Sequence, residues 1–288
     1  AVLTLSAPPG RPGSAGAPAA GLAQASHAGP TYVELRLVPN QPGDNRLEVR
    51  IDPGPGRAAP ADVRLRLLPD GSSVRLRPGG GSADHIFSGS LHLPAPGRYG
   101  FEVTYRLGEA VERVLFPDWP LPAPDAAELL KQSEEAMAGL LSVRIHETLS
   151  DGIQTGETWY WHVAPDRVKA QVSGGTSELR IIGRDRWVTT DGENWEHDRL
   201  AEPVRVPDVS SYTAQATEIH VLGRQRLDGH DHFVVAFRYG DSATRFKVWI
   251  DTESYRMRRL EMIYPRHYMV WRFDQFDAPV AVTPPDAD

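Results

Sequence analysis

The pattern that most constrains this chain is a period-two alternation of apolar and polar residues, which begins near Thr31 and recurs as far as Phe276. Side chains alternate across a β-strand, so this period indicates strands. In the first half, segments rich in Pro, Gly, Asp and Asn, such as Pro39–Asn45 and Pro94–Arg98, separate the strands. Short strands with frequent turns are typical of a β-sandwich. We therefore expect residues 31–119 to form an immunoglobulin-like sandwich.

A proline-rich segment and one amphipathic stretch divide the chain. Residues 117–124 contain four prolines, and the sequence predicts a stiff linker over 120–124. Asp125 and Glu128 have the spacing of a helix capping box, and apolar residues then recur at helical spacing to Leu141. After this predicted helix the alternation resumes. We expect residues 125–285 to form a curved antiparallel sheet, a half-barrel whose concave face is covered by the helix, so that the whole chain is mainly β.

The first 30 residues lack this alternation. Residues 8–30 are rich in Pro and Gly and contain no acidic residue, a composition that cannot bury enough apolar surface to offset the entropy of ordering. We expect a disordered linker over 1–30. The apolar segment Ala1–Ala7 allows a second interpretation, in which this linker follows the end of a truncated membrane helix.

Composition excludes several classes of function. The formal charge of −7 argues against nucleic acid as a partner. The absence of cysteine rules out disulfides, thiolate metal sites and cysteine nucleophiles. The chain has no G-x-S-x-G, H-E-x-x-H or P-loop motif. The sequence therefore predicts a binding protein and not an enzyme.

Two pairs of side chains have the chemistry of metal ligands. His230 and His232 are two residues apart, so on a strand both imidazoles point to one face and could chelate copper or zinc. His267 and Met269 have the same spacing, and imidazole with thioether suits Cu(I). Copper is the one cofactor that these pairs suggest. The alternatives are a solvated hairpin end for the first pair and an apolar sheet face for the second.

Tryptophan is concentrated in the second half, which holds six of the seven. A wide, Trp-rich sheet face either packs as a core or lines an apolar cavity. The cavity hypothesis predicts a pocket for a lipid or another apolar ligand between the sheet and the helix. Its predicted lining comprises Trp159, Trp161, Trp187, Trp249, Trp271, Met137 and Leu140.

The second half resembles the lipoprotein-carrier superfamily of LolA, LolB and the LppX-type lipoproteins. The resemblance rests on four segments at strand ends and turns, which are Trp159–Arg167, Ile181–Trp187, Gly223–Val235 and Lys247–Leu260. It implies a half-barrel with one helix and an apolar ligand, such as a lipid.

The first half resembles the YtkA- and FixH-like sandwich modules, in Pro39–Ile51 and Pro94–Arg106, and the opening Ala1–Gly10 is similar to the end of a membrane helix in copper-resistance D (CopD) proteins. This resemblance implies an extracytoplasmic, membrane-tethered, non-catalytic binding module with a membrane domain in the same chain. The alternatives are a carrier or sensor of an apolar ligand and a protein–protein interaction module.

Overall fold

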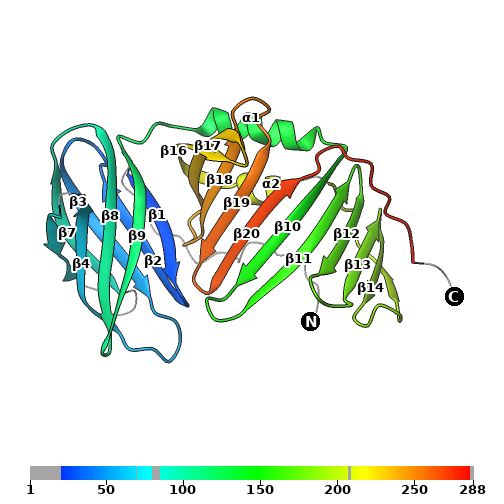
Figure 1. Cartoon of the computed structure of the whole chain (residues 1–288), viewed down its shortest axis with the longest axis horizontal. Coiled ribbons are helices and arrows are strands. Elements are labelled where there is room, and N and C mark those ends of the chain that lie inside the picture. The colour runs from blue at the N-terminus through cyan, green and yellow to red at the C-terminus, as the bar shows by residue number, and fades with distance from the viewer. Residues whose placement is uncertain (1–20, 70, 80–84, 207–208, 286–288) are drawn as a thin grey trace.

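The computed structural model describes residues 21–69, 71–79, 85–206 and 209–285, so the predicted apolar opening at Ala1–Ala7 lies outside the described residues. Two β-rich parts lie side by side, a sandwich and a wide curved sheet with one long helix (Figure 1). The predicted mainly β fold, with large curved antiparallel sheets, is confirmed.

The sandwich is built from two antiparallel sheets that the described residues define. In the first sheet the spatial order is β1 (Leu22–Ala28), β2 (Thr31–Val38), β3 (Gly43–Asp52), β7 (Ile86–Leu93) and β6 (Arg77–Pro78). In the second it is β5 (Ser73–Arg75), β4 (Pro60–Leu68), β8 (Gly97–Leu107) and β9 (Ala110–Leu121).

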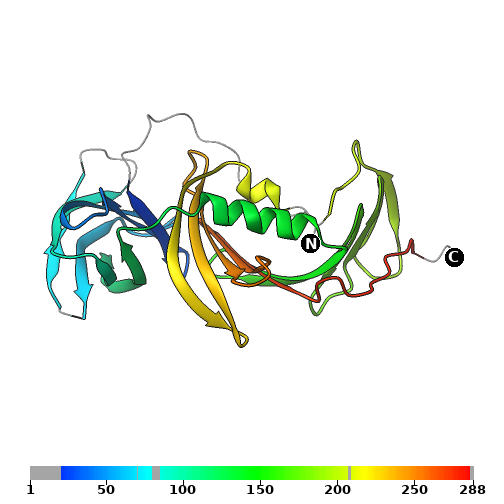
Figure 2. The same cartoon turned by 90° about the horizontal axis from the view of Figure 1, so that it is seen from above.

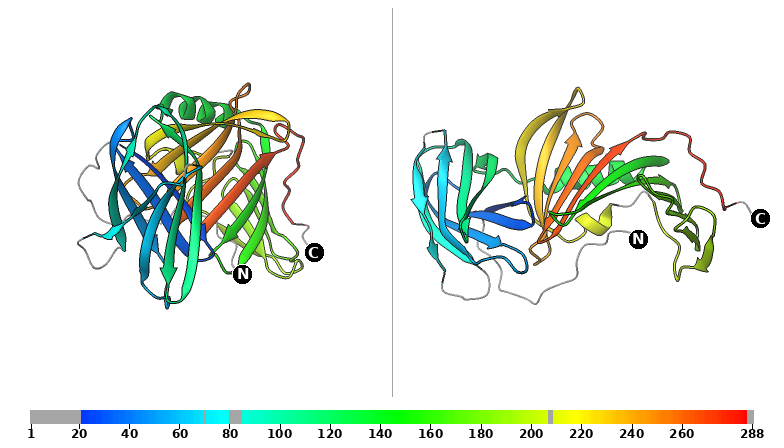
Figure 3. Two further views of the ribbon diagram at one scale, coloured as in Figure 1. Left: turned by 60° about the vertical axis from the view of Figure 1, so that its left-hand side comes forward. Right: turned by 60° about the horizontal axis from the view of Figure 1, so that its bottom comes forward.

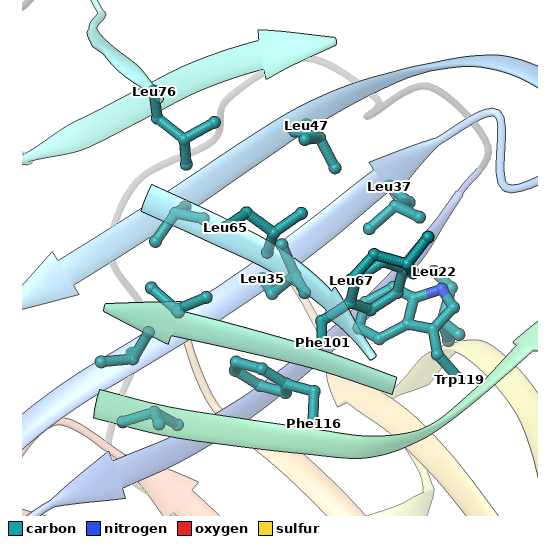
Figure 4. Packing of buried hydrophobic residues seen from close by; sticks show 14 of the residues in the cluster. Leu22, Leu35, Leu37, Leu47, Leu65, Leu67, Leu76, Phe101, Phe116 and Trp119 are labelled. Carbon is teal, nitrogen blue, oxygen red and sulfur yellow. The ribbon is translucent and has the colours of Figure 1, made fainter. Parts of the chain in front are cut away.

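The sandwich core follows directly from the alternation in the sequence. Leu35 and Leu37 of β2 and Leu47 of β3 point between the sheets and are inaccessible to solvent. Trp119 of β9 lies in this core, edge-on to Phe101 and among leucine side chains (Figure 4). Its indole nitrogen donates to the side-chain oxygen of Asn40 at 2.8 Å, so the buried polar end of the ring is satisfied.

Two predicted boundaries of the sandwich differ from the structure. The predicted linker over 1–30 is wrong for Leu22–Ala28, because this segment pairs along its whole length with β2 and buries Leu22 in the core. The predicted linker over 120–124 is wrong for its first two residues, since Pro120 and Leu121 pair with β8. Prolines are tolerated there because β9 is an edge strand.

The second part is one antiparallel sheet with eleven strands in the described residues. It consists of two meanders that meet where the last strand pairs with β10, so the sheet is not a single up-and-down run. In spatial order the strands are β15 (Glu196–Arg199), β14 (Asp185–Thr189), β13 (Glu178–Ile182), β12 (Arg167–Val172), β11 (Thr155–Val163), β10 (Ser142–Ser150), β20 (His267–Asp274), β19 (Met257–Tyr264), β18 (Arg245–Asp251), β17 (His230–Tyr239) and β16 (Ala216–Leu227).

Helix α1 (Ala127–Ala138) lies across the concave side of this sheet, beside the short helix α2 (Ser210–Thr213) (Figure 2). The sequence predicts the helix correctly but overestimates its length at the C-terminal end, where Gly139 ends it. Asp125 accepts a hydrogen bond from the backbone of Ala127, whereas the residue at the cap position, Ala126, offers no side-chain oxygen. The expected capping box is therefore incomplete.

The sandwich packs against the convex side of the sheet (Figure 3). Four residues of the sheet belong to the same apolar cluster as the sandwich core, which are Leu222, Val234, Ala236 and Trp249. Buried polar contacts accompany them. Arg245 pairs with Glu34 at 3.0 Å, and the Tyr32 hydroxyl donates to the Ala243 carbonyl at 2.9 Å. The two predicted units therefore share one continuous core in the folded chain.

Two turns meet at the lower edge of this junction. Gly152, in the turn between β10 and β11, has φ of +90°, and a Cβ atom there would lie 2.2 Å from the carbonyl oxygen of Gly29. A distance this short is not tolerated between a Cβ atom and a backbone oxygen, so only glycine lets the two turns approach this closely.

Candidate functional site

The concave side of the large sheet is a continuous apolar surface. Inward residues of β17 to β20, among them Phe237, Val248 and Leu260, are buried beneath helix α1. All four methionines of the chain lie in this one cluster, which are Met137, Met257, Met262 and Met269. Methionine is unbranched and polarizable, so it repacks around differently shaped neighbours more readily than branched side chains do.

The helix that covers this surface has a narrow apolar face. Leu130 and Met137 are buried against the sheet, and Leu140 follows just after the helix. Between them Ser133 is buried, and its hydroxyl has no hydrogen-bond partner among the described residues. A buried hydroxyl without a partner costs about 1–3 kcal/mol. The contact between helix α1 and the sheet is therefore weaker than an all-apolar face of the same size would give.

A buried carboxylate interrupts the apolar surface. Glu147 of β10 follows Val143 and Ile145 on the inward side and is 3% exposed. Its two oxygens accept from the Tyr160 hydroxyl at 3.0 Å and from the Trp271 indole nitrogen at 2.7 Å. Both donors are themselves in the apolar cluster. The carboxylate therefore ties together β10, β11 and β20 at the seam of the two meanders.

Two phenols near this carboxylate and two imidazoles farther along the sheet are uncharged. Burial, and then the charge of Glu147, raise the pKa values of Tyr160 and Tyr212, so both phenols stay protonated. Burial lowers the pKa of His162 to about 4, and it lowers the pKa of His267 against the opposing effect of Glu147. Both imidazoles are therefore neutral near pH 7, and the Nε2 atom of each has no partner in the described residues.

The structure separates the predicted cavity residues between the two sides of the sheet. Met137, Leu140 and Trp271 lie on the concave side. Trp159 and Trp161 share a face, but Tyr160 points inward, so both indoles lie on the convex side. Trp187 also lies opposite its inward neighbour Val188, and Trp249 packs into the sandwich cluster. Alternation fixes which residues share a face, and it does not say which face is the inner one.

The indoles on the convex side contact cationic or imidazole side chains instead of a ligand cavity. Arg144 lies over the ring of Trp159 at 4.7 Å, and Lys169 lies over that of Trp161 at 5.5 Å. The ring of Trp187 stacks on His197 with 4.9 Å between centroids. These contacts keep the amphipathic indoles half-buried.

Four pockets stand out among the described residues, and none of these four is lined by helix α1. One of about 70 Å³ lies at the junction, and two lie on the sandwich. The fourth, of about 420 Å³, lies over the ends of β17, β19 and β20 on the convex side. On the concave side Val248, Leu260 and Met262 are inaccessible to solvent, so the apolar surface beneath the helix is closed by its own side chains in this conformation.

The predicted metal-ligand pairs are placed differently from each other. His230 and His232 both line the 420 Å³ pocket, together with Arg258, Arg259 and Arg272. Three guanidinium groups repel a cation, so this pocket does not favour copper. His267 and Met269 lie on the concave side, where Met269 is part of the packed cluster. Within the described ranges, no group of three or more His, Asp or Glu residues is placed to hold a metal ion.

Comparisons with known proteins show a limited similarity. No family model and no curated protein matches the chain. Among solved structures it is similar to the Mycobacterium tuberculosis lipoprotein LppX, at 15% identity over 55% of this chain and 97% of that one, with a TM-score of 0.42. LprF from Mycobacterium bovis matches at 14% identity over 57% and 100% of the two chains, with a TM-score of 0.42.

A DUF1329 family protein from Desulfovibrio piger is similar at 8% identity over 54% of this chain and 93% of that one, with a TM-score of 0.30. The first of these three bears the name of the LppX-type lipoproteins that the motifs of the second half resemble. In the part of the chain that the structure describes, neither helix combines the length and the apolarity that a membrane-crossing helix needs.

Proposed function

We propose that the protein is a non-enzymatic, extracytoplasmic binding protein that takes up an apolar, lipid-like ligand between helix α1 and the concave side of the large sheet. The observation that carries this proposal is the concentration of all four methionines in one apolar cluster, with Met137 on the helix and the other three on the sheet beneath it. Methionine-rich surfaces repack around ligands of different shape. The extracytoplasmic location rests on the motif resemblance to lipoprotein carriers.

Uptake in this proposal requires the helix to move, because the surface beneath it is closed. Only Leu130, Ser133 and Met137 are buried along α1, and Ser133 contributes an unpartnered hydroxyl. A ligand that replaces these contacts with acyl chain gains the apolar area that the helix covers, at about 25 cal/mol per Å². The ligand therefore competes with the helix for the same surface and does not need a preformed cavity.

The polar group at the base of this surface gives the ligand an orientation. Glu147, with its donors Tyr160 and Trp271, forms the polar region beneath the helix. A ligand carboxylate placed here would face the charge of Glu147, whereas an uncharged hydroxyl or amide would not. We therefore expect neutral polar heads, such as monoacylglycerols, to bind more tightly than free fatty acids of equal chain length.

Intrinsic fluorescence and thermal stability test this function with a matched pair of variants. The delipidated chain is titrated with monoolein and with oleate, and a ligand of the folded state raises Tm by mass action. Trp271 lies on the inner surface and Trp159 on the outer one. We expect a saturable fluorescence change that Trp271→Phe abolishes and Trp159→Phe preserves. Absence of saturable binding to either lipid, or a signal lost only in Trp159→Phe, would contradict the proposal.

A thiol probe reports the helix movement separately. The chain contains no cysteine, so Met137→Cys introduces a single buried thiol and Leu141→Cys a single exposed one. We expect bound ligand to change the rate at which a maleimide labels Cys at 137 and to leave the rate at 141 unchanged. Equal labelling rates at 137 with and without bound lipid would show that the helix keeps its place.

A further inference from the structure

A second candidate binding site is the 420 Å³ pocket on the convex side. It lies at one end of strands β17, β19 and β20, which are close neighbours in the sheet in Figure 1. Its walls carry three arginines, two histidines and two aspartates, with Leu227 and Phe273 as apolar lining. The charged and imidazole residues are Arg258, Arg259, Arg272, His230, His232, Asp228 and Asp274.

Two of the arginines are placed against each other by the register of the sheet. Arg259 and Arg272 are directly opposite on β19 and β20, and His146 follows Arg272 in the same row on β10. Like charges directly opposite on one sheet face destabilise the folded chain. Arg259 has a partner in Glu261 and lies over the ring of Trp249. Arg272 is exposed and has no hydrogen bond or ion pair with the residues that the structure describes.

The acidic side chains near the pocket are mostly engaged elsewhere. Asp274 accepts two hydrogen bonds from Arg144, at 2.8 and 2.7 Å, so its charge is matched on β10. Asp228 lies in the hairpin turn with a positive φ of 50°. Arg258 lies over the ring of Phe276. The pocket therefore carries more cationic than anionic groups, and among the described residues neither Arg258 nor Arg272 has an ion-pair partner.

Buried nitrogen atoms without partners line the same pocket. His232 is 1% exposed, and its Nδ1 atom lies 2.9 Å from the carbonyl oxygen of His230. A carbonyl can only accept, so Nδ1 carries the proton, and Nε2 is left without a partner among the described residues. The Nε atoms of Arg258 and Arg259 are also buried and unpartnered. The two guanidinium N–H groups require an explanation, because buried donors are normally satisfied, whereas the Nε2 atom of His232 is an acceptor and does not bind a deprotonated oxyanion.

We propose that this pocket is a binding site for an oxyanion, a phosphoryl or a carboxylate group. Guanidinium groups bind these anions in a planar, two-point geometry that suits them better than it suits spherical ions. The anion would lie between Arg259 and Arg272 and remove their mutual repulsion. The site lies on the opposite side of the sheet from helix α1, so it does not rest on the proposed apolar ligand. Oxyanions of this kind occur both in free solutes and in lipid head groups.

The proposal predicts that removing a charged side chain from this site does not lower the free energy of unfolding. Arg272→Gln removes one of two opposed charges, so we expect the variant to be as stable as the wild type or more stable without ligand. The same variant should lose the stabilisation that an added oxyanion gives. Arg64→Gln is the matched control, since Arg64 is an exposed sandwich arginine outside the pocket. A merely structural role for Arg272 predicts lower stability and no change in the response to anions.

Calorimetric titration and thermal unfolding with inorganic phosphate, glycerol 1-phosphate and acetate, all at constant ionic strength, test the site. We expect saturable binding of at least one of them, weakened at least tenfold by Arg272→Gln and unchanged by Arg64→Gln. Co-sedimentation with phosphatidic acid or phosphatidylcholine vesicles distinguishes the source: selective, Arg272-dependent binding to phosphatidic acid points to a lipid head group, and binding of the soluble anions alone points to a free solute. No saturable binding of any anion or vesicle, or equal weakening by both variants, would overturn the proposal.

Discussion

The contact between the turns at Gly29 and Gly152 offers a sharp test of how the sandwich is held on the sheet. Gly152→Ala has two separate costs. An L-residue in the left-handed region costs about 1–2 kcal/mol, and Gly152 has φ of +90°. The added Cβ would also lie 2.2 Å from the Gly29 carbonyl oxygen and 2.5 Å from the Cα atom of Pro30. These are backbone atoms, so the turns must separate, and overpacking of this kind typically costs a further 1–3 kcal/mol or so.

Gly174→Ala is the matched control for the first of these costs. Gly174 lies in another hairpin turn of the same sheet, has φ of +70°, and has open space where the Cβ would be. Gly29→Ala probes the same contact from the sandwich side, where the nearest atom would lie at an ordinary 3.6 Å. We expect the free energy of unfolding to fall by about 2–5 kcal/mol in Gly152→Ala and by about 1–2 kcal/mol in Gly174→Ala.

Urea unfolding of the full chain, followed by tryptophan fluorescence and by circular dichroism, measures these differences. The two probes should give coincident transitions in the wild type, because the shared core couples both parts. In Gly152→Ala we expect the loss of stability to come with a separation of the two transitions. If Gly152→Ala and Gly174→Ala lost the same free energy within about 0.5 kcal/mol, a typical limit for such comparisons, the close approach of the turns would be refuted.

Three further predictions concern buried polar groups. Glu147→Leu should lower the free energy of unfolding by about 2–5 kcal/mol, because the Tyr160 hydroxyl and the Trp271 indole would lose their acceptor. Glu147→Gln should lower it clearly less, and urea unfolding measures the difference. His162 has a pKa of about 4 in the folded chain, below the ordinary 6.5, so the unfolded chain binds the proton first as the pH falls. The free energy of unfolding should therefore fall between pH 6.5 and 4, by up to about 1.4 kcal/mol per pH unit. His162→Phe should remove this dependence on pH. Arg245→Met should lower the free energy of unfolding by about 3–5 kcal/mol, because it leaves the largely buried carboxylate of Glu34 without its cation. An unchanged urea midpoint would contradict this.

The strands and the helix could be predicted because the spacing of apolar residues that defines each of them lies within a short segment of the sequence. Segments such as Tyr32–Val38 alternate strictly, and the helical spacing from Ala126 is regular. Strand β1 was missed because three of the seven residues of Leu22–Ala28 are alanine and a Pro- and Gly-rich stretch lies beside it. Its stability comes from pairing with β2. The join between β10 and β20 could not be predicted, since it pairs segments about 125 residues apart with no local signal.

The candidate sites likewise divide into features that a single segment reveals and features that only strand pairing creates. Glu147 could have been found from the sequence, because it continues the inward series of Val143 and Ile145 and a carboxylate at such a position needs partners. The basic pocket could not, since Arg259 and Arg272 become neighbours only through the register of β19 and β20. The two histidines of the pocket were correctly placed on one face, but nothing near them in the sequence shows that arginines share that face.

The strands of the large sheet differ in how many of their faces are covered by other parts of the protein. This difference determines which element can move to open the concave side. Strands β16 to β18 are covered on the convex side by the sandwich, where Val234 and Trp249 join its core, and on the concave side by buried residues such as Phe246. Strand β15, at the other edge, is exposed along its length. Opening the concave surface by bending the supported strands would break both cores at once. Moving helix α1 breaks only its own narrow face, at Leu130 and Met137, so we expect a ligand to displace the helix and not the strands.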